Sequence, residues 1–318
     1  MTLRRAFLPV LLLASPLAAV PPSVDPGLAE LQARDAQLFA AGWRLATANA
    51  PFCERAAPAL GLSILDADGF GDPGKVRRQL ALSGDIAVGA VAPGSAAAEA
   101  GVSSHDTLIS INGVDLATRY PPAKPAWQRL IEVTAALDAA AAAGPVNLTL
   151  ARAGEAARTI TLTGTPACPS RFEVLDSGGR AAAEGTRVIF GRRFPGFAYP
   201  ESEFAAAVAH ELAHNLLRHR VALDAAGRTL GNVRSTEREA DRLMPWLLAN
   251  AGYEPDAAVR FMERWGPRHG GGLFRKPTHE GWKERAEVIR AEIEKITPLL
   301  AQEGKADWAR HFSRETLD

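Results

Sequence analysis

The sequence has little of three features that would direct it to particular partners. Its 36 basic and 36 acidic side chains cancel, so no net charge attracts nucleic acid or anionic lipid, and we expect no nucleic-acid partner. Beyond residues 1–20 no apolar run reaches membrane length, so we expect no transmembrane span in the mature chain. No cysteine follows the N-terminal apolar stretch closely, which argues against a lipid anchor.

The N-terminus has the pattern of an export signal. Arg4 and Arg5 precede an apolar stretch over residues 6–20 that two prolines interrupt, and this stretch is too short for a membrane span. We therefore predict a signal peptide over residues 1–20 and a periplasmic or secreted mature protein rather than one held by an uncleaved anchor. The paired arginines partly resemble a twin-arginine signal, and ordinary secretion fits equally well.

Only two cysteines occur, Cys53 and Cys168. In an oxidising compartment they would form a disulfide, and the alternative is two separate buried thiols. We favour the bridge because the two positions bracket a module, described below.

The strongest local motif is His-Glu-x-x-His over residues 210–214. Apolar residues at helical spacing predict a helix here, which places His210 and His214 on one face, where both could bind a divalent cation such as zinc. Glu211 sits beside them and is better suited to the role of general base than to that of ligand. A pair of surface histidines on an ordinary amphipathic helix is the alternative.

A second acidic element follows, in which Glu237 and Asp241 share a helix face. It resembles the Glu-x-x-Ala-Asp element of gluzincin peptidases. That resemblance implies that Glu237 is the third zinc ligand and that Asp241 supports a ligand histidine, His210. Thr236 and Glu239 would form a capping box at the start of this second helix. The alternative is a solvated acidic helix start.

Residues 209–215, 237–242 and 252–255, with Thr278, His279 and Arg285, together resemble the CAAX prenyl protease and HtpX family of zinc peptidases. The resemblance implies one Zn²⁺ per chain. It also implies that His279 stabilises the oxyanion or gates the site and that Arg285 holds His279. The sequence departs from the family pattern at Glu280, where proline is usual, and at Pro245 inside the second helix.

Residues 86–102 and 106–113 resemble a PDZ domain of the bacterial protease type. The pattern predicts a strand, a Pro-Gly turn, a short helix and a second strand, followed by a helix over 125–142 and a closing hairpin over 146–162. A peptide would then bind between the strand over 86–91 and the helix that carries Trp127, with C-terminal peptides as candidates. The alternative is a module that only packs or spaces.

We therefore predict an α+β protein with a mostly helical zincin-type peptidase domain and an inserted PDZ-like, partly open β-barrel. The predicted divisions are residues 1–20 (signal peptide), 21–56 (N-terminal helix of the peptidase domain), 57–166 (PDZ-like domain) and 167–318 (catalytic domain). The N-terminal helix would pack on the catalytic helices. A short hairpin over 172–175 and 186–190 would provide an edge strand that holds the substrate backbone through Val188, Ile189, Phe190 and Gly191.

The function that these features predict is an exported zinc endopeptidase that hydrolyses protein or peptide substrates recruited by the PDZ-like domain, as in quality control of envelope proteins. Two other classes remain open. One is a PDZ-based binding or chaperone protein with a structural zinc site, and the other is a zinc amidase that acts on a non-protein substrate.

Overall fold

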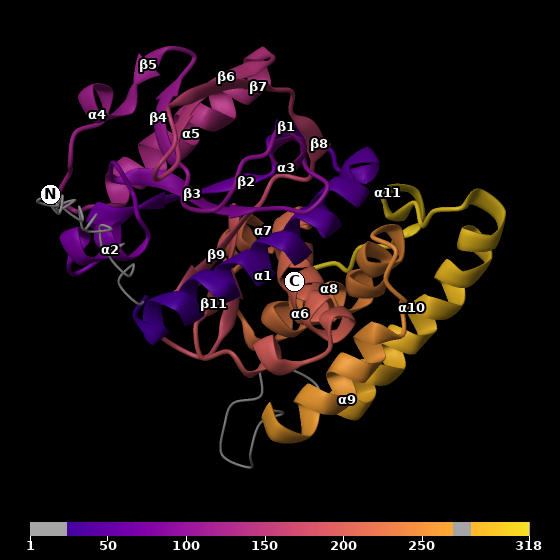
Figure 1. The fold of residues 1–318 in the computed structure, drawn as a ribbon. Coiled ribbons are helices and arrows are strands. Elements are labelled where there is room, and N and C mark those ends of the chain that lie inside the picture. Colours follow the sequence, from indigo (N-terminus) through magenta and orange to yellow (C-terminus); the bar gives the residue numbers. More distant parts are fainter. Residues whose placement is uncertain (1–23, 270–280, 318) are drawn as a thin grey trace, which may run out of the picture.

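The computed structural model describes residues 24–269 and 281–317 and shows an α+β architecture (Figure 1). The predicted signal peptide lies outside the described residues. Helix α1 (Pro26–Ala48) comes first. Asp25 caps it by accepting hydrogen bonds from the backbone N–H groups of Gly27 and Leu28, and Pro26 occupies the first turn, where no N–H is needed. This confirms the predicted N-terminal helix.

Helix α1 lies between the two halves of the molecule (Figure 1). It contacts strand β9 (Arg171–Leu175) and the helices α6 (Glu201–Leu216) and α8 (Leu230–Asn250), as expected, and also strand β3 (Ile86–Val91). The approach to β9 is close, because a Cβ atom on Gly42 would lie 2.3 Å from the ring of Phe172. A side chain larger than hydrogen at position 42 would push α1 away from the sheet.

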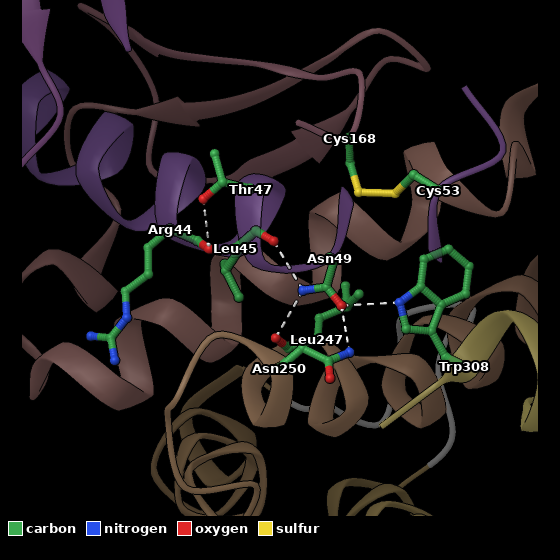
Figure 2. The surroundings of a disulfide bond; sticks show 9 residues. All are labelled: Arg44, Leu45, Thr47, Asn49, Cys53, Cys168, Leu247, Asn250 and Trp308. Carbon is green, nitrogen blue, oxygen red and sulfur yellow. Dashed lines mark hydrogen bonds between the residues drawn. A yellow bond between two sulfur atoms is a disulfide. The ribbon is translucent and has the colours of Figure 1, made fainter. Parts of the chain in front are cut away.

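Residues 57–167, called here the inserted module, leave and re-enter the rest of the chain through one paired stem. Strand β1 (Ala57–Ala59) pairs antiparallel with β8 (Thr165–Ala167), so the two connections lie side by side. The disulfide between Cys53 and Cys168 joins the chain at the base of this stem, as predicted (Figure 2).

The inserted module has its own hydrophobic core, centred on Val88, Leu108, Leu137 and Leu148. Its sheet has the order β2-β3-β4-β6-β7, with β5 beside β4, and does not close on itself within the residues described. The remaining helices and strands of the module are β2 (Leu62–Asp66), α2 (Pro73–Gln79), α3 (Ala96–Glu99), β4 (Thr107–Ile111), β5 (Val114–Asp115), α4 (Leu116–Arg119), α5 (Trp127–Ala143), β6 (Val146–Ala151) and β7 (Arg158–Leu162).

The groove predicted beside β3 is wrong in position. β3 pairs with β2 on one side and β4 on the other, so its backbone groups are taken up within the sheet. β2 is the strand at that end of the sheet, and α5 contacts it. The sequence pattern did not reveal that Leu62–Asp66 would add outside β3.

The predicted hairpin over 172–175 and 186–190 is also wrong. β9 and β11 (Arg187–Gly191) pair in parallel, while β10 (Ala181–Ala183) forms the antiparallel hairpin with β11. The sheet order is β10-β11-β9, which puts β11 in the centre. β10 takes one side of β11, so β9 pairs on the other side. The chain reverses direction between β9 and β10 and again between β10 and β11, so β9 and β11 run parallel.

The C-terminal half is helical. Helix α8 begins at Leu230 with Thr229 as its N-cap, so Thr236 and Glu239 lie inside the helix and the predicted capping box is wrong. α6 packs against α8, and α8 against α10. The other helices of this half are α7 (His219–Ala226), α9 (Ala257–His269), α10 (Trp282–Glu303) and α11 (Trp308–His311). Elsewhere in the described chain and before α6, short 3-10 turns occur at Ala50–Phe52, Ala67–Gly69 and Pro195–Ala198.

A fully buried asparagine joins the end of α1 to this helical half (Figure 2). The amide nitrogen of Asn49 donates to the carbonyl oxygens of Leu45 and Leu247, at 2.9 and 3.1 Å. Its amide oxygen accepts from Asn250 and from the indole N–H of Trp308. All four bonds of this side chain are made inside the protein, which fixes α8 against the segment that leads into the disulfide.

Replacing both cysteines by alanine should destabilise the protein. The bridge closes a segment with a sequence separation of 115, and a constraint of that size is worth about 2–5 kcal/mol. Thermal and urea unfolding of wild type and of Cys53→Ala/Cys168→Ala measure the difference. A reductant should lower the melting temperature of the wild type and leave that of the variant unchanged, and equal stability of the two oxidised proteins would contradict the expectation.

Candidate metal centre

Three side chains from two helices converge on one point. His210 and His214 lie one turn apart on α6, and their Nε2 atoms are 3.3 Å apart. Glu237 comes from α8, with Oε2 3.4 Å from Nε2 of His210 and Oε1 3.6 Å from Nε2 of His214. These side chains are only 12–19% exposed. The group is therefore two imidazoles and a carboxylate that face one another in a largely dry position.

The spacing of these atoms suits one small divalent ion. Four ligand atoms at tetrahedral positions, about 2.0–2.2 Å from a metal, lie roughly 3.3–3.6 Å from one another. The two imidazole nitrogens are separated by a distance in this range, and each of them lies at such a distance from one oxygen of Glu237, His210 from Oε2 and His214 from Oε1. Imidazole nitrogens and a carboxylate oxygen are donors that zinc commonly takes in proteins. The group of His210, His214 and Glu237 could hold a metal ion.

Asp241 lies beside His210. Its Oδ1 atom lies 3.0 Å from Nδ1 of His210, the ring nitrogen that faces away from Glu237, although the contact falls outside good hydrogen-bond geometry. Arg285 from α10 donates to both carboxylate oxygens of Asp241, at 2.6 and 2.7 Å. The family resemblance assigned Arg285 to His279, and His279 lies outside the described residues. Among the described residues, Arg285 holds Asp241.

The electrostatics of the group favour positive charge. Burial opposes protonation of His210, but the carboxylates of Asp241 and Glu237 outweigh it and raise the pKa of His210 to about 10. Burial likewise opposes ionisation of Asp241, yet Arg285 and His210 lower the pKa of Asp241 to about 2. A cation at this position is thus stabilised by its surroundings, whether it is a proton or a metal ion.

Glu211 follows His210 on α6 and is partly buried. Val188, Ile189, Phe190 and Gly191 do not fit their predicted role. They are buried in the central strand of the β10-β11-β9 sheet, with backbone partners on both sides, and so cannot accept a substrate strand. The edge of this sheet nearest α6 is β10, which α6 contacts.

The sequence reading missed one residue at the site, His219. Its Nδ1 atom lies 2.8 Å from Nδ1 of His214, and its Nε2 atom lies 3.0 Å from Oε2 of Glu239. Residues five apart do not share a face of a continuous helix. Here α6 ends at Leu216, and Arg218 takes a left-handed conformation (φ 57°) that starts α7 in a new direction. The only available signal was a third histidine close after the motif.

His219 and Glu239 are buried together. Burial lowers the pKa of His219 to about 4, and the charges of His214 and Arg314 act in the same direction, so the ring is neutral at pH 7. Burial opposes ionisation of Glu239, but hydrogen bonds from His219 and Arg314 overcome it and lower its pKa to about 2. The pair is therefore a neutral ring beside a carboxylate.

A cavity of about 570 Å³ lies between the inserted module and the C-terminal half. Its walls come from β2 and α5 of the module, from α1 and β9, and from the end of α6 at Asn215. Asn215 follows His214 in the chain, accepts from the backbone N–H of Gly185 and donates to the hydroxyl of Ser170. His210, His214 and Glu237 are not among the residues that line this cavity.

Comparisons with known proteins do not assign this chain to a family. The chain matches no protein-family model, and a search of curated proteins found no match. Across residues 24–269 and 281–317, no helix combines the length and apolar character needed to cross a membrane.

Asp241→Asn should weaken the binding of a divalent metal by about 10- to 100-fold, as loss of a carboxylate behind a ligand histidine commonly does. An amide cannot match the charge that holds His210, and Arg285 loses its anionic partner. Competition between the protein and a chelator, with Zn²⁺ as the probe, measures the change. Glu203→Gln is the matched control. Glu203 of α6 is also a buried carboxylate, and it pairs with Arg264 of α9. Equal affinities of the two variants would contradict the role of Asp241.

Proposed function

We propose that the protein is a zinc-dependent endopeptidase. The observation that carries the proposal is the convergence of His210, His214 and Glu237 on one point, with a further glutamate, Glu211, next to the first histidine in the chain. Two imidazoles and one carboxylate are the ligand set of zinc hydrolases that cleave peptide bonds. The likeness of the motifs to gluzincin peptidases of the CAAX prenyl protease and HtpX type supports the same function.

A zinc ion held by these residues would supply a Lewis acid that polarises a carbonyl group and makes water more acidic. The chain supplies the rest. Both histidines must be neutral at Nε2, and Asp241 keeps the proton of His210 on Nδ1. Glu211 accepts the proton of the attacking water and passes it to the nitrogen of the leaving amine.

The inserted module would recruit substrate. Its resemblance to a PDZ domain supports binding of an extended peptide or a C-terminus as an added strand. The place that fits is the side of β2 next to α5, where the 570 Å³ cavity begins. Because that cavity reaches the end of α6, recruited chains would lie near the helix that bears the histidines.

Export fits the same proposal. Residues 1–20 have the pattern of a signal peptide, and the Cys53–Cys168 disulfide is of a kind that persists in oxidising compartments such as the periplasm. A soluble, exported peptidase of this type would act on unfolded or extended envelope proteins.

Glu211→Gln should leave zinc bound and lower cleavage of an unfolded protein by about 10²- to 10⁴-fold, because the amide cannot accept a proton. Zinc content by mass spectrometry and cleavage of reduced, alkylated protein measure the two effects. Glu201→Gln is the control on the same helix, since Glu201 is exposed and pairs with Arg44 and Tyr253. A wild type that holds zinc and cuts nothing would instead favour the binding or chaperone function, and cleavage by Glu211→Gln at the wild-type rate would refute the role of Glu211.

A further inference from the structure

Each ligand histidine is backed by a buried carboxylate that is itself held by an arginine. Behind His210 stands Asp241 with Arg285. Behind His214 stands Glu239 with Arg314, but here a second histidine, His219, lies between the carboxylate and the ligand. The two supports therefore differ by one inserted imidazole.

The contacts form a continuous path from residues 312–317, called here the C-terminal segment, to His214. The guanidinium of Arg314 donates to Oε1 of Glu239 at 2.7 Å, and the backbone N–H of Glu315 donates to the same oxygen at 2.7 Å. Oε2 of Glu239 faces Nε2 of His219 at 3.0 Å, and Nδ1 of His219 faces Nδ1 of His214 at 2.8 Å.

This path allows only one arrangement of protons when a metal is bound. A carboxylate accepts, so Nε2 of His219 carries a proton that faces Glu239. With a metal on Nε2 of His214, the one proton of that ring is on Nδ1, and the 2.8 Å contact leaves no room for a second proton on Nδ1 of His219. Nδ1 of His219 is then an acceptor, and Nδ1 of His214 must carry the proton that it accepts. That leaves a lone pair on Nε2 of His214, the atom 3.6 Å from Oε1 of Glu237 and 3.3 Å from Nε2 of His210.

We propose that His219 and Glu239 are positioning residues that set the tautomer and orientation of His214 for the metal, with Arg314 and Glu315 holding Glu239 in place. The inference rests on the proposed zinc site and extends it to a segment that is remote in sequence. Zinc affinity is thereby coupled to the attachment of the C-terminal segment.

A purely structural role explains the arrangement less well. His219 and Glu239 are 2% and 1% exposed, and a buried ionic or polar pair is generally no more stabilising than well-packed apolar residues of the same volume. Apolar residues could fill the same space between α7 and α8, but they could not accept the proton of His214.

Glu239→Gln tests the inference with almost no change of shape. Oε1 accepts the two shorter bonds, from Arg314 and from the N–H of Glu315, at 2.7 Å each, whereas Oε2 accepts from Arg314 at 3.3 Å. The amide oxygen therefore takes the position of Oε1, and the amide NH₂ faces Nε2 of His219. The ring must then carry its proton on Nδ1, which forces the proton of His214 to Nε2, where the metal should bind. Zinc affinity, measured by competition with a chelator, should fall by about 10- to 100-fold.

Glu292→Gln is the matched control. Glu292 is an equally buried carboxylate that accepts from Arg242 and Trp246 and also contacts α8, but it does not touch a ligand histidine or His219. Both variants should lower the melting temperature of the metal-free protein, and only Glu239→Gln should lose zinc affinity. If the two variants bind zinc alike, the inference is overturned.

A second pair of variants keeps the test independent of the effects of Glu239 on folding. His219→Asn retains an acceptor oxygen that can face His214, whereas His219→Leu retains none. With Co²⁺ as a spectroscopic probe, His219→Asn should bind more tightly than His219→Leu and give a spectrum closer to that of the wild type. Equal binding by both would overturn the inference.

Neither experiment measures cleavage. A protein that shows the coupling without proteolysis therefore contradicts only the proposed function, and a wild type that binds no metal at His210, His214 and Glu237 contradicts both.

Discussion

The contact between α6 and α8 is the constraint on which the candidate site depends. α6 alone offers two imidazoles, which are too few to hold a catalytic metal, and α8 provides the carboxylate that completes the set. α8 also carries Asp241, which lies beside His210, and Glu239, which reaches His214 through His219. A shift of one helix along the other would disturb the ligands and both supports together.

The structure restrains that contact from both sides. On one side α1 packs against α6 and α8, and Asn49 at its end bonds Leu247, Asn250 and Trp308. The disulfide follows a few residues later and holds the stem of the inserted module. On the other side the C-terminal segment and α10 reach back to α8 through arginines. The module is thus attached near the elements that orient α6 and α8.

Local patterns predicted what depends on neighbours in the chain. The spacing of His210 and His214 predicted their shared face, and resemblance to known peptidases assigned Glu237 and Asp241 to the same site. What failed depends on contacts between distant segments. Ala181–Ala183 has no strand-like pattern, yet it forms a strand between β9 and β11 in the chain, and the two reversals of direction that it introduces make β9 and β11 parallel. His219 was missed because a single left-handed residue, Arg218, returns the chain towards His214.

The central claim is that one metal ion binds to His210, His214 and Glu237. A crystal structure of the protein purified with zinc, with anomalous data collected on both sides of the zinc absorption edge, tests it most directly. The account predicts one anomalous peak per chain, bonded to Nε2 of both histidines and to the carboxylate of Glu237. Zinc bound elsewhere, or no peak in a fully folded protein, would contradict it.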